Sequence, residues 1–201
     1  MGRGIWERIE GARDRWDVLR HPFYQRWSRG ELSRGELARY AAQYRHAVVA
    51  IAEASEALAR ALPGDETAAR HAAEERDHVA LWDRFAAAAG ARPEPPTPET
   101  SACIAEWTAG EDALDRLARL YAIEGAQPAI ASVKRAGLVE RYGFEDGPAT
   151  DYFRVHAARD SEHAAEARAL ISALVRDGDA DRLAAAAEGA FRANWRLLDG
   201  V

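Results

Sequence analysis

The chain of 201 residues has one cysteine, Cys103, and therefore cannot close an intramolecular disulfide bond. It has no run of about 20 apolar residues that would span a bilayer, and its first residues lack the apolar core of a secretory signal. These absences predict a cytoplasmic protein without a membrane partner. No segment alternates apolar and polar residues for long enough to predict a strand, so we expect helices.

Lysine is almost absent as well, since Lys134 is the only lysine among 27 basic residues and the arginines are spread along the chain. A net charge of -6 without a basic cluster argues against nucleic acid and favours a small-molecule partner. Hydrophobic residues make up 48% of the sequence, which is enough to bury one sizeable core. We expect a single domain over residues 1–201.

Alanine, arginine, glutamate and leucine dominate the sequence and predict an all-α fold. Breaks in the helical pattern occur at His21-Pro22, at Pro63-Gly64 and in the proline-rich residues 93–98. Pro128 is expected to kink a helix beside the carbonyl of Glu124. The predicted helices cover residues 5–19, 33–62, 65–89, 97–108, 112–142, 150–176 and 180–198, with a short helical turn after Pro22.

The most informative pattern is a set of three potential metal ligands, His156, Asp160 and His163. Their spacing of i, i+4 and i+7 places all three side chains on one side of a helix, over about two turns. Imidazole and carboxylate groups aligned in this way can hold a metal ion. A solvated polar helix face is the alternative.

Further potential ligands lie on two earlier helices. Glu75 and His78 share one helix face at i, i+3, and Glu74 could replace Glu75 as the inward carboxylate. His71, four residues before Glu75, is a further candidate, although an exposed or supporting role is the preferred interpretation. Glu124 stands in an apolar stretch, where burial requires a partner, a shifted pKa or a metal; an ion pair with an arginine is the alternative.

Together, three helices offer three carboxylates and three imidazoles, which fits two iron ions with open positions for dioxygen. In ferritin-like proteins, each of two helices supplies Glu-x-x-His and each of two others supplies a lone glutamate. On that pattern Glu124 is one lone glutamate, and the second would have to be Glu53 or Glu56.

Two further stretches, His21-Pro-Phe-Tyr24-Gln-Arg-Trp27 and Tyr40-Ala-Ala-Gln-Tyr44, resemble the haem-oxygenase-like diiron oxidases, and the resemblance covers essentially the whole chain. It implies a seven-helix bundle like that of the TenA thiaminases and the pyrroloquinoline-quinone synthase PqqC. It also implies two iron ions or an iron–manganese pair, dioxygen as co-substrate, an external reductant and a homodimer. The family's metal positions fall on Glu75, His78, Glu124, His156, Asp160 and His163.

Two branches of this superfamily fit less well. A TenA thiaminase needs a nucleophilic cysteine near the helix that carries Tyr121, but Cys103 lies just after the proline-rich stretch. PqqC-type enzymes work without a metal, which would leave the complete ligand set unexplained.

The chain resembles most the para-aminobenzoate synthases related to the Chlamydia protein associating with death domains. This resemblance rests on the spacing from Glu124 to Lys134 to His156 and on the ending Trp195-Arg-Leu-Leu-Asp-Gly-Val201. It implies that para-aminobenzoate for folate biosynthesis is made from an internal tyrosine, with Lys134 as the amino donor. The matching tyrosines are Tyr24, Tyr40 and Tyr152.

Lys134 lies about 80° around an ideal helix from Glu124, so the expected kink at Pro128 has to turn it towards the site. A lysine retained among so many arginines suggests an amine that loses its proton, which arginine cannot replace. A structural role is the alternative.

Two aromatic residues lie close to the predicted ligands on their helices. Tyr152 precedes His156 by four residues, and Trp82 follows His78 by four. Both could carry a radical beside the metal site, whereas ordinary core packing is the alternative.

Two other classes of function stay open. One is a diiron oxidase that acts on a diffusible amino acid, amine or fatty acid in a specialised biosynthetic pathway. The other is a nonenzymatic metal-binding helical bundle.

Overall fold

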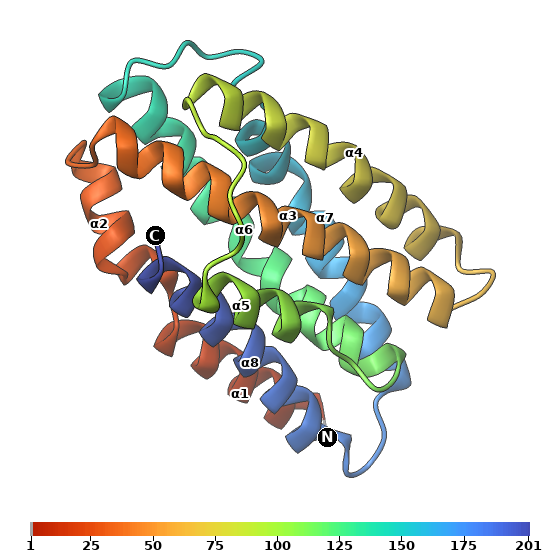
Figure 1. The fold of residues 1–201 in the computed structure, drawn as a ribbon. Coiled ribbons are helices and arrows are strands. Elements are labelled where there is room, and N and C mark those ends of the chain that lie inside the picture. The colour runs from red at the N-terminus through yellow and green to blue at the C-terminus, as the bar shows by residue number, and fades with distance from the viewer. Residues whose placement is uncertain (1) are drawn as a thin grey trace.

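The computed structural model describes residues 2–201, and this range contains eight α-helices and one short 3-10 helix (Figure 1). The all-α prediction is confirmed, since residues 2–201 contain no strand. The expected count of seven helices is wrong, because the segment after His21 forms a helix of its own. The helices are α1 (Gly2–Arg15), α2 (Pro22–Arg29), α3 (Arg34–Ala61), α4 (Glu66–Ala88), α5 (Pro98–Thr108), α6 (Ala113–Arg141), α7 (Asp151–Leu174) and α8 (Asp179–Asp199).

The chain between α1 and α2 turns through local side-chain hydrogen bonds. The first helix ends at Arg15, earlier than predicted, and the Asp17 carboxylate starts a 3-10 turn by accepting a hydrogen bond from a backbone N–H at 3.0 Å. His21 then caps α2, since its Nδ1 accepts the backbone N–H of Phe23 at 3.1 Å. Pro22 stands in the first turn of α2, where a backbone N–H would have no helical acceptor. The N–H that proline lacks therefore costs the helix no hydrogen bond.

The longer helices begin where the sequence predicts. Ser33 and Glu36 form the capping box of α3, in which each side chain bonds the backbone of the other residue. Thr97 caps α5 ahead of Pro98. α6 continues through Pro128 without interruption. No helix in the described range has both the length and the apolar composition needed to cross a membrane.

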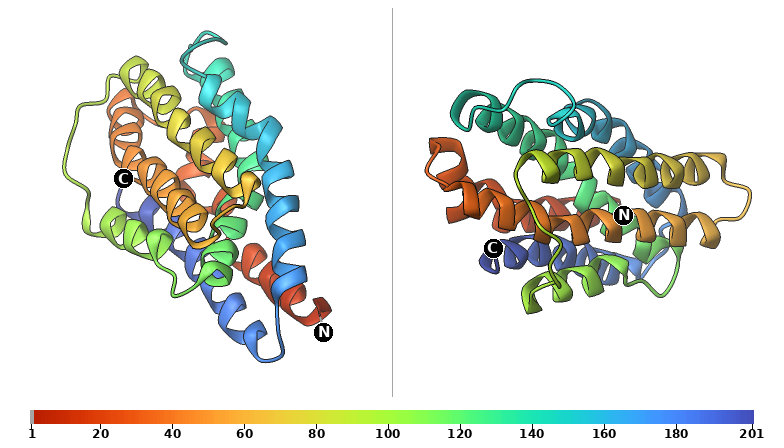
Figure 2. Two further views of the ribbon diagram at one scale, coloured as in Figure 1. Left: turned by 90° about the vertical axis from the view of Figure 1, so that its right-hand side faces the viewer. Right: turned by 45° about the horizontal axis from the view of Figure 1, so that its top comes forward.

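The helices form a bundle in which α4 lies at one edge and α1 and α8 lie at the opposite edge (Figures 1 and 2). α6 packs along α7, α3 packs along α4, and α4 also contacts α7. This arrangement brings together the three helices that carry the predicted ligands.

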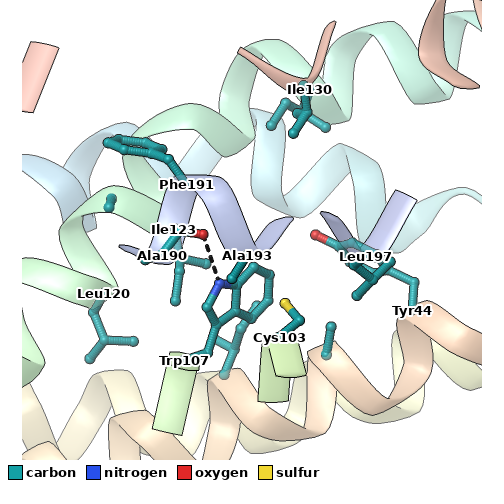
Figure 3. Close-up of a cluster of buried hydrophobic side chains, with 14 of the residues drawn as sticks. Tyr44, Cys103, Trp107, Leu120, Ile123, Ile130, Ala190, Phe191, Ala193 and Leu197 are labelled. Atoms are coloured by element: carbon teal, nitrogen blue, oxygen red, sulfur yellow. Dashed lines mark hydrogen bonds between the residues drawn. The ribbon is translucent and has the colours of Figure 1, made fainter. Parts of the chain in front are cut away.

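On the far side of the core, α5 packs against α8. Trp107 of α5 is buried, and its indole N–H donates to the carbonyl of Ala190 in α8 at 3.1 Å (Figure 3). Cys103 lies in the same apolar cluster, where burial raises the pKa of its thiol. A thiol held protonated in an apolar core acts as a packing group.

α2 approaches α6 closely at Gly137. A Cβ atom at this position would lie 2.5 Å from Nε1 of Trp27, so the contact requires glycine. The Trp27 indole donates to the backbone carbonyl of Lys134 at 3.2 Å. The same contact therefore fixes the part of α6 that carries the single lysine.

Candidate metal centre and aromatic chamber

Two helices that lie far apart in the sequence place their predicted ligands against each other. The rings of His78 in α4 and His156 in α7 have centroids 4.6 Å apart. Oε1 of Glu75 lies 3.1 Å from Nδ1 of His78. All three side chains are buried, and their ligand atoms lie within 4.8 Å of one another.

A second group of potential ligands shares Glu75. The ligand atoms of His71, Glu75 and His163 also lie within 4.8 Å of one another. Nε2 of His71 lies 3.7 Å from Oε1 of Glu75 and 3.0 Å from Oε1 of Glu124. Glu124 thus adds α6 to the two helices that form the site. Among the side chains described, residues 4–201, no arginine pairs with Glu124, so the alternative of an arginine ion pair is not observed there.

Asp160 occupies the middle of the ligand face of α7. Its carboxylate is fully buried, and Oδ2 lies 2.8 Å from Nδ1 of His156. Burial raises the pKa of Asp160. Burial alone would lower the pKa of His71, but the carboxylates of Glu124 and Glu75 raise it to about 11. The surroundings are strongly negative and favour a bound cation.

Several buried polar atoms of these residues have no hydrogen-bond partner, which tests whether a metal fits here. Such atoms cost about 1–3 kcal/mol each when left unsatisfied. A cation would satisfy them together, and the mixture of imidazole and carboxylate donors suits iron. The atoms are Nε2 of His71, Oε2 of Glu75, Oε1 of Glu124, Nε2 of His156 and Nδ1 of His163. We call the full set the metal cluster: His71, Glu75, His78, Glu124, His156, Asp160 and His163.

Glu74 lies at the edge of the metal cluster. Its Oε2 is 3.1 Å from Nε2 of His163, and its other oxygen pairs with Arg159. The side chain is 25% exposed, whereas that of Glu75 is 1% exposed. Glu75 is therefore the inward carboxylate, and Glu74 orients the ring of His163.

The single lysine lies in a separate apolar space. Lys134 is 1% exposed, and its Nζ has no hydrogen-bond partner. The ring of Tyr44 is closest, with its centroid 4.4 Å from Nζ. Burial lowers the pKa of Lys134 to about 7. We call the rings around this amine the aromatic chamber; they belong to Tyr24, Tyr40, Tyr44, Trp82 and Phe153.

Within the chamber, two of the predicted tyrosines are hydrogen-bonded to each other. The hydroxyl oxygens of Tyr24 and Tyr40 lie 2.9 Å apart, and both rings are fully buried. Burial raises the pKa of each phenol well above its ordinary value. Both tyrosines are therefore neutral near neutral pH.

Tyr152 connects the aromatic chamber with the metal cluster. Its ring centroid lies 4.2 Å from that of His156 and 4.8 Å from that of Trp82. The Trp82 ring in turn lies 5.1 Å from the ring of Tyr44. An unbroken series of buried aromatic contacts thus leads from a predicted ligand to the surroundings of Lys134.

Comparison with known proteins agrees with this arrangement. Residues 37–195 match the family model described as an iron-containing redox enzyme. The chain belongs to the iron-containing redox enzymes. The protein is therefore an enzyme, an oxidoreductase. A family that contains iron also agrees with the donor set of the metal cluster.

Several relatives of this iron-containing redox enzyme carry the name 4-aminobenzoate synthase. The relative from Chlamydia muridarum is 32% identical over 199 residues, which cover 90% of this chain and 83% of the relative. The relative from Nitrosomonas europaea is 32% identical over 209 residues, which cover 92% of this chain and 85% of the relative.

Solved structures confirm the predicted TenA-like, haem-oxygenase-like fold. A TenA homolog from Pseudomonas syringae pv. tomato superposes with a TM-score of 0.83 at 19% identity, over 98% of this chain and 90% of the other. A domain with a heme oxygenase-like fold from Shewanella denitrificans gives a TM-score of 0.76 at 21% identity, over 95% and 88% of the two chains.

The metal cluster of this iron-containing redox enzyme borders a largely apolar pocket. The pocket has a volume of about 430 Å³ and reaches His71, Glu124 and His163. Leucines supply much of its wall, among them Leu117 and Leu120 of α6. The metal cluster therefore has an open side, whereas the aromatic chamber is buried.

Two expectations about individual residues are changed by the structure. Glu53 is exposed and Glu56 pairs with Arg76, so neither supplies a further glutamate to the cluster. The ferritin-like pattern fails because α3 turns its glutamates outward. His71 lies inside the cluster with its side chain only 12% exposed, so of the two roles expected for it, exposed or supporting, the exposed one is not observed. Its distance of four residues from Glu75, which repeats that from His156 to Asp160, was the available signal.

Proposed function

We propose that this enzyme is a dioxygen-dependent 4-aminobenzoate synthase that consumes one of its own tyrosines. The main support is the amine of Lys134, which is buried without a hydrogen-bond partner among rings that include Tyr24 and Tyr40. An amine enclosed with phenol rings provides both the nitrogen and the ring of the product within one protein. The names of the relatives from Chlamydia and Nitrosomonas agree with that product.

The composition of 4-aminobenzoate defines which bonds change. The Cα–Cβ bond of Tyr24 breaks and leaves a glycine residue, and the ring C–O bond breaks with its oxygen leaving as water. The Cε–Nζ bond of Lys134 breaks and leaves an aldehyde at Cε. A ring C–N bond forms, and Cβ is oxidised from a methylene to a carboxyl group. The oxidant is dioxygen, which is reduced to water with electrons from an external reductant. These changes remove six electrons from the protein, which two molecules of dioxygen accept together with two electrons from the reductant.

The residues of the metal cluster would hold two metal ions, either two irons or an iron–manganese pair. Glu75, His78 and His156 form one group of donors, and His163, Glu124 and Asp160 complete the predicted set. When bound, iron supplies the reduction of dioxygen and the one-electron oxidation of a nearby aromatic side chain.

Lys134 provides a nitrogen that can react. A protonated amine has no lone pair for bond formation, and burial lowers the pKa of Lys134 to about 7. Burial therefore makes the neutral amine far more accessible near neutral pH than it is for an exposed lysine. An arginine in this place would stay protonated.

The aromatic chamber controls where protons and electrons go. The hydrogen bond between Tyr24 and Tyr40 allows one phenol to pass its proton to the other as it is oxidised. The contacts from His156 through Tyr152 to Trp82 provide a route for that oxidation over short steps. Complete burial keeps water away from the reactive ring.

An isotope experiment tests this proposal. Because Lys134 is the only lysine, protein made with lysine carrying nitrogen-15 at Nζ has the label at one side chain. We expect the iron-loaded protein, given dioxygen and reductant without any substrate, to release nitrogen-15-labelled 4-aminobenzoate. Intact-mass analysis should show the protein losing the corresponding mass. A labelled arginine preparation is the matched control and should give unlabelled product.

A diffusible substrate is the second candidate function, and the pocket beside His71, Glu124 and His163 favours it. An oxidase of this kind would turn over added amino acids, amines or fatty acids repeatedly and would leave its own mass unchanged. Release of unlabelled 4-aminobenzoate, or repeated turnover without a change in protein mass, would favour this function over the self-consuming reaction.

A further inference from the structure

The ligand faces of α4 and α7 carry the same spacing of residues. His71, Glu75 and His78 stand at i, i+4 and i+7 on α4. A histidine, an acidic residue and a second histidine stand at the same three places on α7, as His156, Asp160 and His163. Each helix therefore presents two imidazoles with a carboxylate between them on one face.

The two faces meet in an antiparallel arrangement. His71, near the start of α4, pairs with His163, late on the ligand face of α7, with ring centroids 4.4 Å apart. His78 pairs with His156 at 4.6 Å. Exchanging the two helices converts one histidine pair into the other, so the cluster has approximate two-fold symmetry with Glu75 and Asp160 in the middle.

We propose that His71 is a metal ligand and that the site consists of two half-sites, each with its own histidine pair. The outer half-site contains His71, His163 and Glu124, and the inner half-site contains His78 and His156. Glu75 contributes to both, since it belongs to both groups of close ligand atoms. This inference rests on the two-metal centre proposed above, and it adds a fourth imidazole to that centre.

The surroundings of His71 are those of a ligand. Its Nε2 is buried without a hydrogen-bond partner, although it lies 3.0 Å from an oxygen of Glu124 that is itself unpartnered. Structural histidines in the same chain differ, because His46 bonds the carbonyl of Glu94 and His21 bonds both a backbone N–H and Asp199. A cation between His71 and Glu124 would satisfy both orphaned atoms.

The two half-sites differ in what lies beyond them. The outer half-site borders the pocket of about 430 Å³, which reaches His71, Glu124 and His163. The inner half-site is covered by Tyr152, whose ring lies 4.2 Å from that of His156. The outer metal should therefore exchange with solution and meet small molecules, while the inner metal faces the aromatic chamber.

Metal binding measured without turnover tests the assignment. Under anaerobic conditions, the wild-type protein is expected to bind two equivalents of Fe(II) in equilibrium dialysis, and one of them should pass to a chelator faster than the other. His71→Ala should bind one equivalent and lose the fast-exchanging phase. With Mn(II), the electron paramagnetic resonance of the wild-type protein should show two coupled ions, and that of His71→Ala an isolated ion.

The control is His46→Ala, which removes an imidazole outside the metal cluster and should keep both equivalents. Thermal unfolding of each variant shows whether it is folded, and His71→Gln serves if His71→Ala is not. Two equivalents with unchanged exchange in the folded His71 variant would overturn the role of His71 and leave the two-metal centre standing. Wild-type protein that binds one equivalent or none would instead overturn the two-metal centre.

Discussion

The hydroxyl oxygens of Tyr24 and Tyr40 lie 2.9 Å apart, inside the ring of aromatic side chains that surrounds the only lysine of the chain. Neither hydroxyl is exposed, and the amine of Lys134 has no competing hydrogen-bond partner. Two neutral phenols and an amine with a lowered pKa are thus enclosed together. The groups proposed to react therefore lie enclosed in a space of their own beside the metal cluster.

Tyr24→Phe should abolish the release of 4-aminobenzoate, because it removes the hydroxyl oxygen that the amine replaces. Tyr40→Phe should lower the rate by about tenfold or more, which corresponds to about 1.4 kcal/mol, through loss of the proton acceptor. Product is measured by chromatography per mole of iron-loaded protein. Tyr121→Phe, on the far side of α6 where its hydroxyl bonds Glu10, should give the wild-type yield. Full yield from Tyr24→Phe with none from Tyr40→Phe would make Tyr40 the source.

Lys134→Met should stabilise the apoprotein at pH 7. In the unfolded chain this amine keeps its proton up to about pH 10.5, whereas in the folded protein burial lowers its pKa to about 7. Between these values the unfolded state binds more protons, so wild-type stability rises with pH. Removing the amine should therefore raise the free energy of unfolding by on the order of 4 kcal/mol at pH 7.

The advantage of Lys134→Met should shrink by about 2 kcal/mol between pH 7 and pH 9, because the slope reaches its full value of about 1.4 kcal/mol per pH unit only above the folded pKa. Urea unfolding of both proteins at several pH values measures it, because other titrating groups cancel in the difference. A difference that stays constant over this range would show that the buried amine keeps its proton in the folded state.

Tyr152→Phe should separate metal binding from product formation. The phenol oxygen of Tyr152 has no hydrogen-bond partner, so the variant loses no bond and keeps the ring against His156. Metal content should stay at the wild-type level, while product release slows by about tenfold or more because phenylalanine is harder to oxidise. Elemental analysis and product chromatography on one preparation report both quantities. Unchanged rates would remove Tyr152 from the oxidation route.

Gly137→Ala should destabilise the protein by about 1–3 kcal/mol, the usual cost of overpacking a close contact. The added Cβ would lie 2.5 Å from Nε1 of Trp27 and would displace the indole that bonds the Lys134 carbonyl. Gly11→Ala is the matched control, since a Cβ there meets nothing within 4 Å. That helical substitution should stabilise by up to about 1 kcal/mol. Equal effects of the two substitutions in urea unfolding would contradict the proposed close contact.

Local interactions explain why the sequence predicted most helix boundaries. Ser33 with Glu36 and Thr97 with Pro98 act within one turn, and such caps can be recognised without knowing the fold. The boundary after α1 was wrong because the Asp17 carboxylate accepts the backbone N–H of Leu19 and starts a 3-10 turn.

The sequence by itself determined the ligand faces of the helices, because helical periodicity alone places His156, Asp160 and His163 on one side of α7. Only the tertiary structure decided that His71 belongs with His163, since the two residues are 92 positions apart and meet only because their helices pack together. It also decided the place of Lys134, which helical rotation alone directs away from Glu124. The structure encloses that amine in rings from α2, α3, α4 and α7, so its chemistry is a property of the packing.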